Sequence, residues 1–158
     1  MILFKFATEI KGLAKVTGHE GWLNAGSMAF GVGRSIPQPT GGSAKREPSP
    51  PSVSEVTFTR DADQASPELF AQACGGESLG TCTIHLLQVS GSETRVFLTI
   101  LLEEAMVSSY SASSGGDNPS ESVSVNFTKV SYQYDTFDGK KVVTGTPKKW
   151  DLAVNKPY

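Results

Sequence analysis

The sequence predicts a mainly β protein: a single-domain β-barrel of two antiparallel sheets, with one short α-helix at about residues 66–74 and a long loop at about 35–52. Three observations indicate this fold. Several segments alternate large apolar residues with small or polar ones, one short segment carries helix start and stop signals, and one stretch is too rich in proline for either structure. About seven strands with one helix favour a barrel or sandwich in which the helix covers an opening or an edge.

Length and charge limit the function. The chain has 158 residues, the size of one ordinary domain, so residues 1–158 are expected to form one domain. The 14 Lys and Arg residues nearly balance the 16 Asp and Glu residues, which argues against a nucleic-acid partner. The first residues lack the basic region of a Sec signal, and no apolar run is long enough for a membrane helix. We therefore expect synthesis in the cytoplasm, no direct membrane insertion, and any export by a route without a signal peptide.

The first two predicted strands cover Ile2 to Thr8 and Trp22 to Arg34. In the second, large residues fall on even positions and small ones on odd positions, so the strand has a packed face and a smooth face. The large residues are Trp22, Met28, Phe30 and Val32, and the small ones are Ala25, Ser27 and Ala29. We expect Met28 and Phe30 to pack inside the barrel.

The stretch from Ser35 to Ser52 breaks this pattern. It holds five prolines and two glycines and has no hydrophobic period, so we expect neither helix nor strand there. A loop of this length inside a small domain is uncommon, and it is more often functional or ordered by a partner than a simple connector. Only about 35 residues precede it, too few for an independent core, which argues against a linker between two domains.

A strand and a helix follow the loop. Val53 to Arg60 is dense in β-branched and aromatic residues, and helix signals come shortly afterwards. Ser66 can cap the free amides, Pro67 suits the first helical position, and Gly75 is placed to end the helix. The apolar residues between them are expected to pack one side of this helix onto a sheet.

A hairpin is predicted next. Cys82–Val89 and Thr94–Leu102 flank a four-residue turn that contains Gly91. The second arm is expected to continue as one strand through Tyr110.

The last third of the chain contains the clearest alternation. Valine and phenylalanine lie on one face of residues 122–128, and Ser122, Ser124, Asn126 and Thr128 lie on the other. The phase changes near Lys129, which indicates a bulge or a change of environment. A turn at Asp138-Gly139 and a short strand over 149–154 complete the prediction.

Few residues in the sequence suggest chemistry. Cys74 and Cys82 are spaced so that a disulfide is possible, but unpaired, buried thiols are the favoured interpretation in a reducing cytosol. His19 and His85 are too few and too scattered for a zinc site, so no metal and no cofactor are predicted. Many serines are present, yet no local signature places a nucleophile beside a base. We therefore do not expect an enzyme.

Several segments, taken together and in order, match a known family. They are Gly18-His19-Glu20-Gly21-Trp22-Leu23, Val56-Thr57-Phe58-Thr59-Arg60-Asp61-Ala62-Asp63-Gln64-Ala65-Ser66-Pro67-Glu68-Leu69, Val107-Ser108-Ser109-Tyr110 before a Gly/Ser turn, and Val125-Asn126-Phe127-Thr128-Lys129-Val130 with a closing Lys149-Trp150-Asp151-Leu152. On these segments nearly the whole chain resembles the Hcp (haemolysin-coregulated protein) family, the tube proteins of bacterial type VI secretion systems. The proline-rich stretch from Ile36 to Ser52 departs from the family's usual sequence.

The resemblance implies a structural subunit. Such subunits form homo-hexameric rings that stack head to tail into a hollow tube inside a contractile sheath. Contraction propels the tube out of the cell with a spike and effector proteins, and small effectors can travel in the ring lumen. The partners implied are therefore other copies of the chain and the spike, sheath and effector proteins of the system.

Two sets of residues are candidates for roles in such a tube. Ala25, Ser27 and Ala29 are expected to face the lumen, although an outer solvent surface is the alternative for this smooth face. The long loop is the natural ring-stacking element, because its prolines limit the entropy lost on docking. Within it, Lys45, Arg46 and Glu47 are candidates for charge contacts between rings, with a solvated loop tip as the alternative.

Two other readings remain open from the sequence. A phage tail-tube subunit has a related architecture, and genomic neighbours rather than the sequence would separate it from a secretion tube. A monomeric β-sandwich binding module would use the long loop as its recognition surface. The polar face of residues 122–128 is compatible with a lumen, a neighbouring subunit or water.

Overall fold

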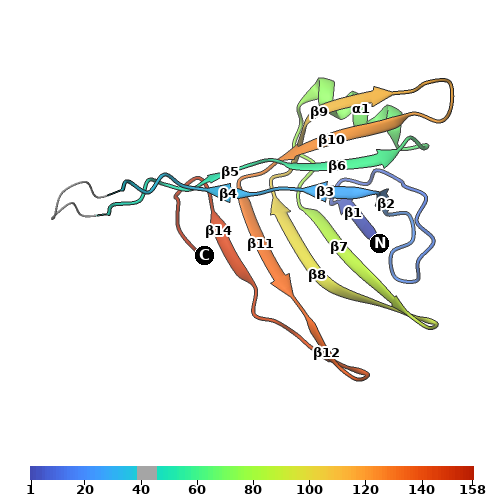
Figure 1. Ribbon diagram of the computed structural model, residues 1–158. Coiled ribbons are helices and arrows are strands. Elements are labelled where there is room, and N and C mark those ends of the chain that lie inside the picture. Colours follow the sequence, from blue (N-terminus) through green and yellow to red (C-terminus); the bar gives the residue numbers. More distant parts are fainter. Residues whose placement is uncertain (39–45) are drawn as a thin grey trace.

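A computed structural model describes residues 1–38 and 46–158 (Figure 1). The described chain is mostly β with one short helix, α1 (Ser66–Gly75), and its two main sheets are antiparallel. The six-stranded sheet has the order β14-β11-β8-β7-β1-β2, formed by β14 (Lys148–Asp151), β11 (Lys129–Tyr134), β8 (Glu93–Glu103), β7 (Cys82–Ser90), β1 (Ile2–Phe6) and β2 (Leu23–Ala25). The four-stranded sheet has the order β3-β6-β10-β9, formed by β3 (Ser27–Ala29), β6 (Val56–Asp61), β10 (Ser120–Asn126) and β9 (Met106–Ser113). The predicted fold class is confirmed.

One hydrophobic core lies between the two sheets. Phe4 of β1 stacks on Phe58 of β6 with ring centroids 4.0 Å apart, and both side chains are fully buried. In β10 the side chains of Val123 and Val125 are buried while the alternate residues are exposed or half-buried, which is the period of a strand with one face on a core. Met28 packs against this core as predicted.

The chain passes between the sheets at three short segments. Gly26 separates β2 from β3, residues 104–105 separate β8 from β9, and residues 127–128 separate β10 from β11. The predicted single strand from Trp22 to Arg34 and the predicted continuous arm to Tyr110 are therefore wrong. In both cases the alternation of apolar residues continues while the chain moves to the other sheet. Alternation along a strand does not show which strand lies beside it. The predicted change of environment near Lys129 is confirmed, because β11 joins the other sheet there.

The helix begins and ends within a residue of its predicted bounds, but its caps differ. Ser66 does not cap it, because the Ser66 hydroxyl accepts a hydrogen bond from the Asp63 amide at 3.0 Å. At the other end, Gly76 rather than Gly75 takes the left-handed conformation, with φ 65°, that ends the helix. Leu69 is the fully buried residue of the helix.

The predicted loop is part of a protruding two-stranded ribbon. β4 (Val32–Gly33) pairs with β5 (Ser52–Val53), and Figure 1 shows this ribbon extending away from the barrel. Ser35 and Ser49 continue the pairing, because the Ser49 amide donates to the Ser35 carbonyl at 2.9 Å. Ser52 lies in a strand, contrary to prediction, while residues 36–38 and 46–51 form neither helix nor strand, as predicted.

Both predicted turns are present. β7 and β8 form a hairpin that closes at Ser90 and Glu93, with Gly91 at φ 65°. A second ribbon joins β12 (Thr136–Asp138) and β13 (Lys141–Val143) through the turn at Gly139. Among the described residues, no helix is long and apolar enough to cross a membrane.

The two cysteines are free thiols in different environments. Cys82 is buried in the core, and burial raises the pKa of its thiol. Cys74 is exposed on α1, so the prediction that both thiols are buried is wrong for this residue.

Candidate functional site

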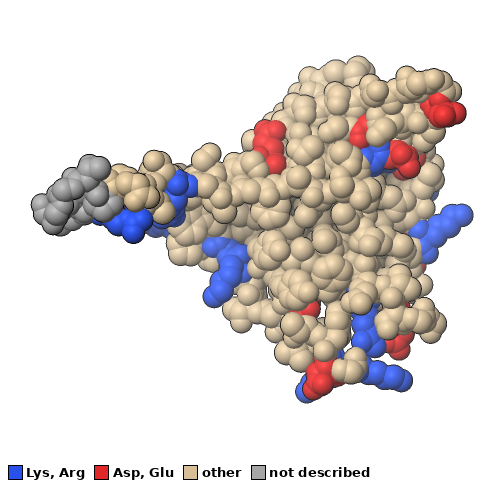
Figure 2. Space-filling view, in the orientation of Figure 1, with Lys and Arg blue, Asp and Glu red and all other residues tan. Residues whose placement is uncertain are grey.

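The outward side of the four-stranded sheet carries mostly small or polar side chains, and the half-buried Met106, opposite Asn126, is the large apolar exception among the described residues. Because Met28, Phe58 and Val123 are cross-strand neighbours on the inward side, the rows on either side of them point outward. We call this surface the hydroxyl face, and its residues are Ser27, Ala29, Thr57, Thr59, Asp61, Ser109, Ser111, Ser113, Ser120, Ser122, Ser124 and Asn126. It contains one acidic residue and no basic one. In Figure 2 the surface over β6 and β10 is mostly uncharged, with charged side chains towards the ends of these strands.

Hydroxyl groups on this face bond to one another across strands. Ser27 pairs with Thr59, and the Thr57 hydroxyl lies 3.1 Å from the Ser124 hydroxyl. Such cross-strand pairs hold short side chains close to the sheet, so the face is smooth as well as polar.

The predicted lumen residues are not all on this face. Ser27 and Ala29 are exposed on it, but Ala25 is half-buried and packs against the core. The strand break at Gly26 changes the phase, so Ala25 and Ser27 lie in different sheets. Ser122, Ser124 and Asn126 belong to the face, while Thr128 lies at a sheet crossing and donates a hydrogen bond to Glu104 at 2.7 Å.

Two of the three predicted ring-stacking residues lie on the ribbon. Arg46 and Glu47 are exposed there, and Lys45 lies outside the described residues. The ribbon's base is fixed to the barrel by apolar contacts around a groove of about 380 Å³, lined by side chains that include Phe30, Val53 and Trp150. The exposed arm therefore projects from a packed base.

Both edges of the four-stranded sheet lack a strand partner in the part of the chain that is described, although α1 packs beside β9 through Phe70 and Tyr110. β3 forms one edge and β9 the other, and no further strand pairs with either. β9 is eight residues long and contains no charged residue and no proline, although its register against β10 shifts at Ser108. Proteins usually protect such edges with charges, prolines or bulges, because an open edge pairs readily with another strand.

A buried charged cluster joins the four-stranded sheet to the start of α1. The Arg60 side chain is 1% exposed and forms ion pairs with Asp63 and with Glu121, whose Oε1 lies 3.1 Å from Arg60 Nε. The Tyr110 hydroxyl donates to Glu121 Oε2 at 2.6 Å, and burial and this carboxylate raise the pKa of Tyr110. The two ion pairs meet the distance expected of charge contacts, but the guanidinium N–H groups are poorly aligned with their acceptors. The sequence shows Arg60 in phase with Val56 and Phe58, which is the signal that would have placed it inside.

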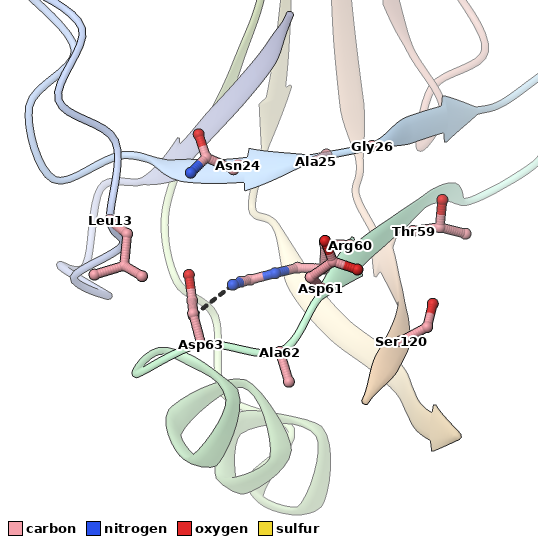
Figure 3. Close-up of a pocket in the computed structure, with 10 residues that line it drawn as sticks. All are labelled: Leu13, Asn24, Ala25, Gly26, Thr59, Arg60, Asp61, Ala62, Asp63 and Ser120. Atoms are coloured by element: carbon pink, nitrogen blue, oxygen red, sulfur yellow. Dashed lines mark ion pairs between the residues drawn. The ribbon is translucent and has the colours of Figure 1, made fainter. Parts of the chain in front are cut away.

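A polar pocket of about 440 Å³ adjoins this cluster (Figure 3). It lies where β2 passes into β3, beside the end of β6 and the start of β10. Its lining includes Asn24, Thr59 and Ser120, and three charged residues, Arg60, Asp61 and Asp63. Figure 3 shows the Arg60 side chain extending from β6 towards Asp63. We call this site the polar pocket.

The structure brings together the two histidines that are distant in the sequence. His19 Nε2 lies 2.7 Å from His85 Nδ1, and Trp22 packs on both rings. The prediction that they are scattered is therefore wrong in space, although no third histidine, cysteine or carboxylate joins them as a metal ligand in the described residues. The contact between His19 and His85 holds residues 7–22 against the outer side of the six-stranded sheet.

The comparisons with known proteins agree with this architecture. The family model described as "Type VI secretion system effector, Hcp" matches residues 4–134. Protein hcp1 of Pseudomonas aeruginosa strain PAO1 is 31% identical over 109 residues, which span 65% of this chain and 66% of that protein.

Solved structures share the fold at lower identity. A protein described as a type six secretion system protein superposes with a TM-score of 0.90 at 23% identity, covering 99% of this chain and 98% of that one. Hcp1 from Salmonella typhimurium gives a TM-score of 0.75 at 20% identity, covering 99% and 97%. The family model covers most of the chain and the fold extends over nearly all of it, so this chain belongs to the Hcp family of type VI secretion system proteins.

Proposed function

We propose that this protein is a structural, non-enzymatic subunit of the type VI secretion inner tube. Copies of the chain form hexameric rings, and the rings stack into a hollow tube that leaves the bacterial cytoplasm on sheath contraction without a signal peptide. The single observation that carries the proposal is the four-stranded sheet, whose outward hydroxyl face holds one acidic and no basic residue and whose two edges have no strand partner among the described residues.

Ring closure explains the edges. If β9 of one copy pairs with β3 of the next, a closed ring leaves no open edge in this sheet. The β9 edge of each copy then meets the β3 edge of the next around the ring, which is a heterologous contact that closes by rotation. Six copies are the number implied by the family.

The hydroxyl face would then line the lumen. Small hydroxyl side chains leave the channel wide, and the absence of basic side chains gives cargo no strong ionic contact with the wall. Ser27 and Ala29 keep their proposed place on the lumen, where small effectors would travel. Spike and sheath proteins are the other proposed partners, and neither a cofactor nor nucleic acid has a role.

The test measures the assembly and then the edge contact. Light scattering after size exclusion should give six times the 16.8 kDa mass of one chain. In a Cys74→Ser background, the double variant Ser27→Cys with Ser111→Cys should give a ladder of up to six chains with a short thiol cross-linker.

The matched controls carry one introduced cysteine each. Neither single variant should form a ladder, because β3 and β9 are expected to meet only each other. A persistent monomer at high concentration would contradict the proposal and favour the monomeric binding module. A hexamer without a ladder would reject the β3–β9 contact alone.

A further inference from the structure

The exposed ribbon carries basic side chains without partners. Arg34 and Arg46 are exposed, and no carboxylate lies within ion-pair distance of either among the described residues. Figure 2 shows basic side chains on this ribbon, away from the body of the barrel. An exposed arginine on a projecting arm can bind a carboxylate of another molecule, because its planar guanidinium group donates two parallel hydrogen bonds to a carboxylate.

The polar pocket has the opposite formal charge. Asp61 is exposed at its rim, and none of the described residues pairs with its carboxylate. Asp63 lines the pocket and Glu121 lies behind it, and both share the single cation Arg60. Three carboxylates against one guanidinium leave a local excess of negative charge, which favours a cationic ligand.

A second, independent feature of the pocket is a buried hydrogen-bond donor without an aligned acceptor. Arg60 Nη1 is buried and has no hydrogen-bond acceptor among the described residues, although Arg60 lines the pocket. A buried donor without an acceptor costs free energy until one is supplied. A backbone carbonyl beside an incoming arginine would supply it, so one arm can satisfy both Asp61 and Arg60.

The ribbon and the pocket lie at opposite ends of the same sheet region. The ribbon continues from the β5 side of β6, and the pocket lies at the other end of β6, near Asp61 (Figure 1). One copy therefore does not fill its own pocket. Complementary surfaces at opposite ends of one subunit produce an open, head-to-tail series of contacts.

We propose that the polar pocket receives the arginine-bearing ribbon of a second copy of this chain in the next ring. Arg46 pairs with Asp61, and the backbone of the arm provides the acceptor for Arg60. This contact rests on the ring stacking proposed above and names its receiving site.

The test is a charge exchange in the full chain. Arg46→Asp and Asp61→Arg, each alone, should leave hexameric rings intact by light scattering but raise the ring concentration needed for stacking by about tenfold, as for a lost interfacial charge pair. The double variant, which restores the pair in reversed order, should recover most of the stacking. Tube length is read by electron microscopy and stacked material by sedimentation, and 0.5 M salt should weaken stacking of the unmodified protein.

The matched control is Asp138→Arg, the same reversal on the β12–β13 ribbon outside the pocket, which should stack normally. Normal stacking of Asp61→Arg, or no recovery in the double variant, would overturn the inference while leaving the proposed function standing. Rings that never stack would also overturn it. A monomeric unmodified protein would instead overturn the proposed function, and with it this contact. If stacking does not depend on Arg46, the inference is also overturned. In that case the polar pocket would be left for a cationic segment of another protein.

Discussion

The outer faces of the two main sheets differ. On the six-stranded sheet, residues 7–22 cover the outer face around β1 and β7 and build a second small core with Leu3, Trp22 and Leu87. On the four-stranded sheet, the hydroxyl face has no such cover among the described residues, and Met106, opposite Asn126 at one end, is the large apolar side chain beside it. β1 and β7 therefore carry apolar residues on both faces, whereas β10 alternates strictly. Strict alternation in one sheet marks the face that stays open to a polar environment.

The largest expected difference between the faces is in packing. Trp22→Ala should lower the free energy of unfolding by about 3–5 kcal/mol, because it removes the largest side chain of the second core. Ser122→Ala on the hydroxyl face is the matched control and should change it by less than about 0.5 kcal/mol. Denaturant unfolding of both variants measures the contrast. Similar losses in the two would mean that the faces are not differently packed.

The next effect concerns the charged cluster beneath the open sheet. Arg60→Met should destabilise the fold by about 3 kcal/mol, because it leaves the buried carboxylate of Glu121 without its cation. Adding Glu121→Gln should recover part of the loss, and thermal unfolding with a double-mutant cycle gives the coupling. If the two changes are simply additive, the residues do not stabilise each other.

The smallest effect is a pH dependence confined to the covered face. Burial, His19 and Lys5 together lower the pKa of His85 from 6.5 to about 4. The unfolded chain therefore takes up this proton near pH 6.5 and the folded protein only near pH 4, so stability falls as the pH decreases between these values and this group has no effect above them.

Replacing the histidine separates its effect from that of the carboxylates. His85→Gln should lose less stability than the unmodified protein between pH 7.5 and 5.5, measured by denaturant unfolding at each pH. Equal losses in the two proteins would show that His85 does not titrate in this way.

Most local signals in the sequence predict the structure correctly, although Ser66 does not cap the helix, while the long-range pairing of strands is not predicted. Proline and glycine placed the helix at 66–74, close to the observed Ser66–Gly75, and Gly91 marked the hairpin. The sheet crossings at Gly26 and Glu104 were missed, because alternation along a strand says nothing about the strand beside it. The His19–His85 contact joins residues 66 positions apart, and only the pairing of β1 with β7 brings them together.

In the candidate site, too, local features were predictable from the sequence and long-range ones were not. Ser27 and Ala29 were correctly placed on one face because β3 is a single short strand, while Ala25 was assigned across the unseen break at Gly26. The polar pocket draws on four separate segments of the chain, from Leu13 to Ser120, so no local motif could have indicated it.

The position of β1 has a consequence for the order in which the subunit forms. Phe4 lies opposite Ile84 in the six-stranded sheet, so the first strand has to remain unpaired on that side until the chain has been made beyond β7. Contacts between residues so distant in sequence slow folding. On a ribosome, β1 can therefore pair with β7 only after residues 82–86 have been made, although β1 is among the first residues to emerge.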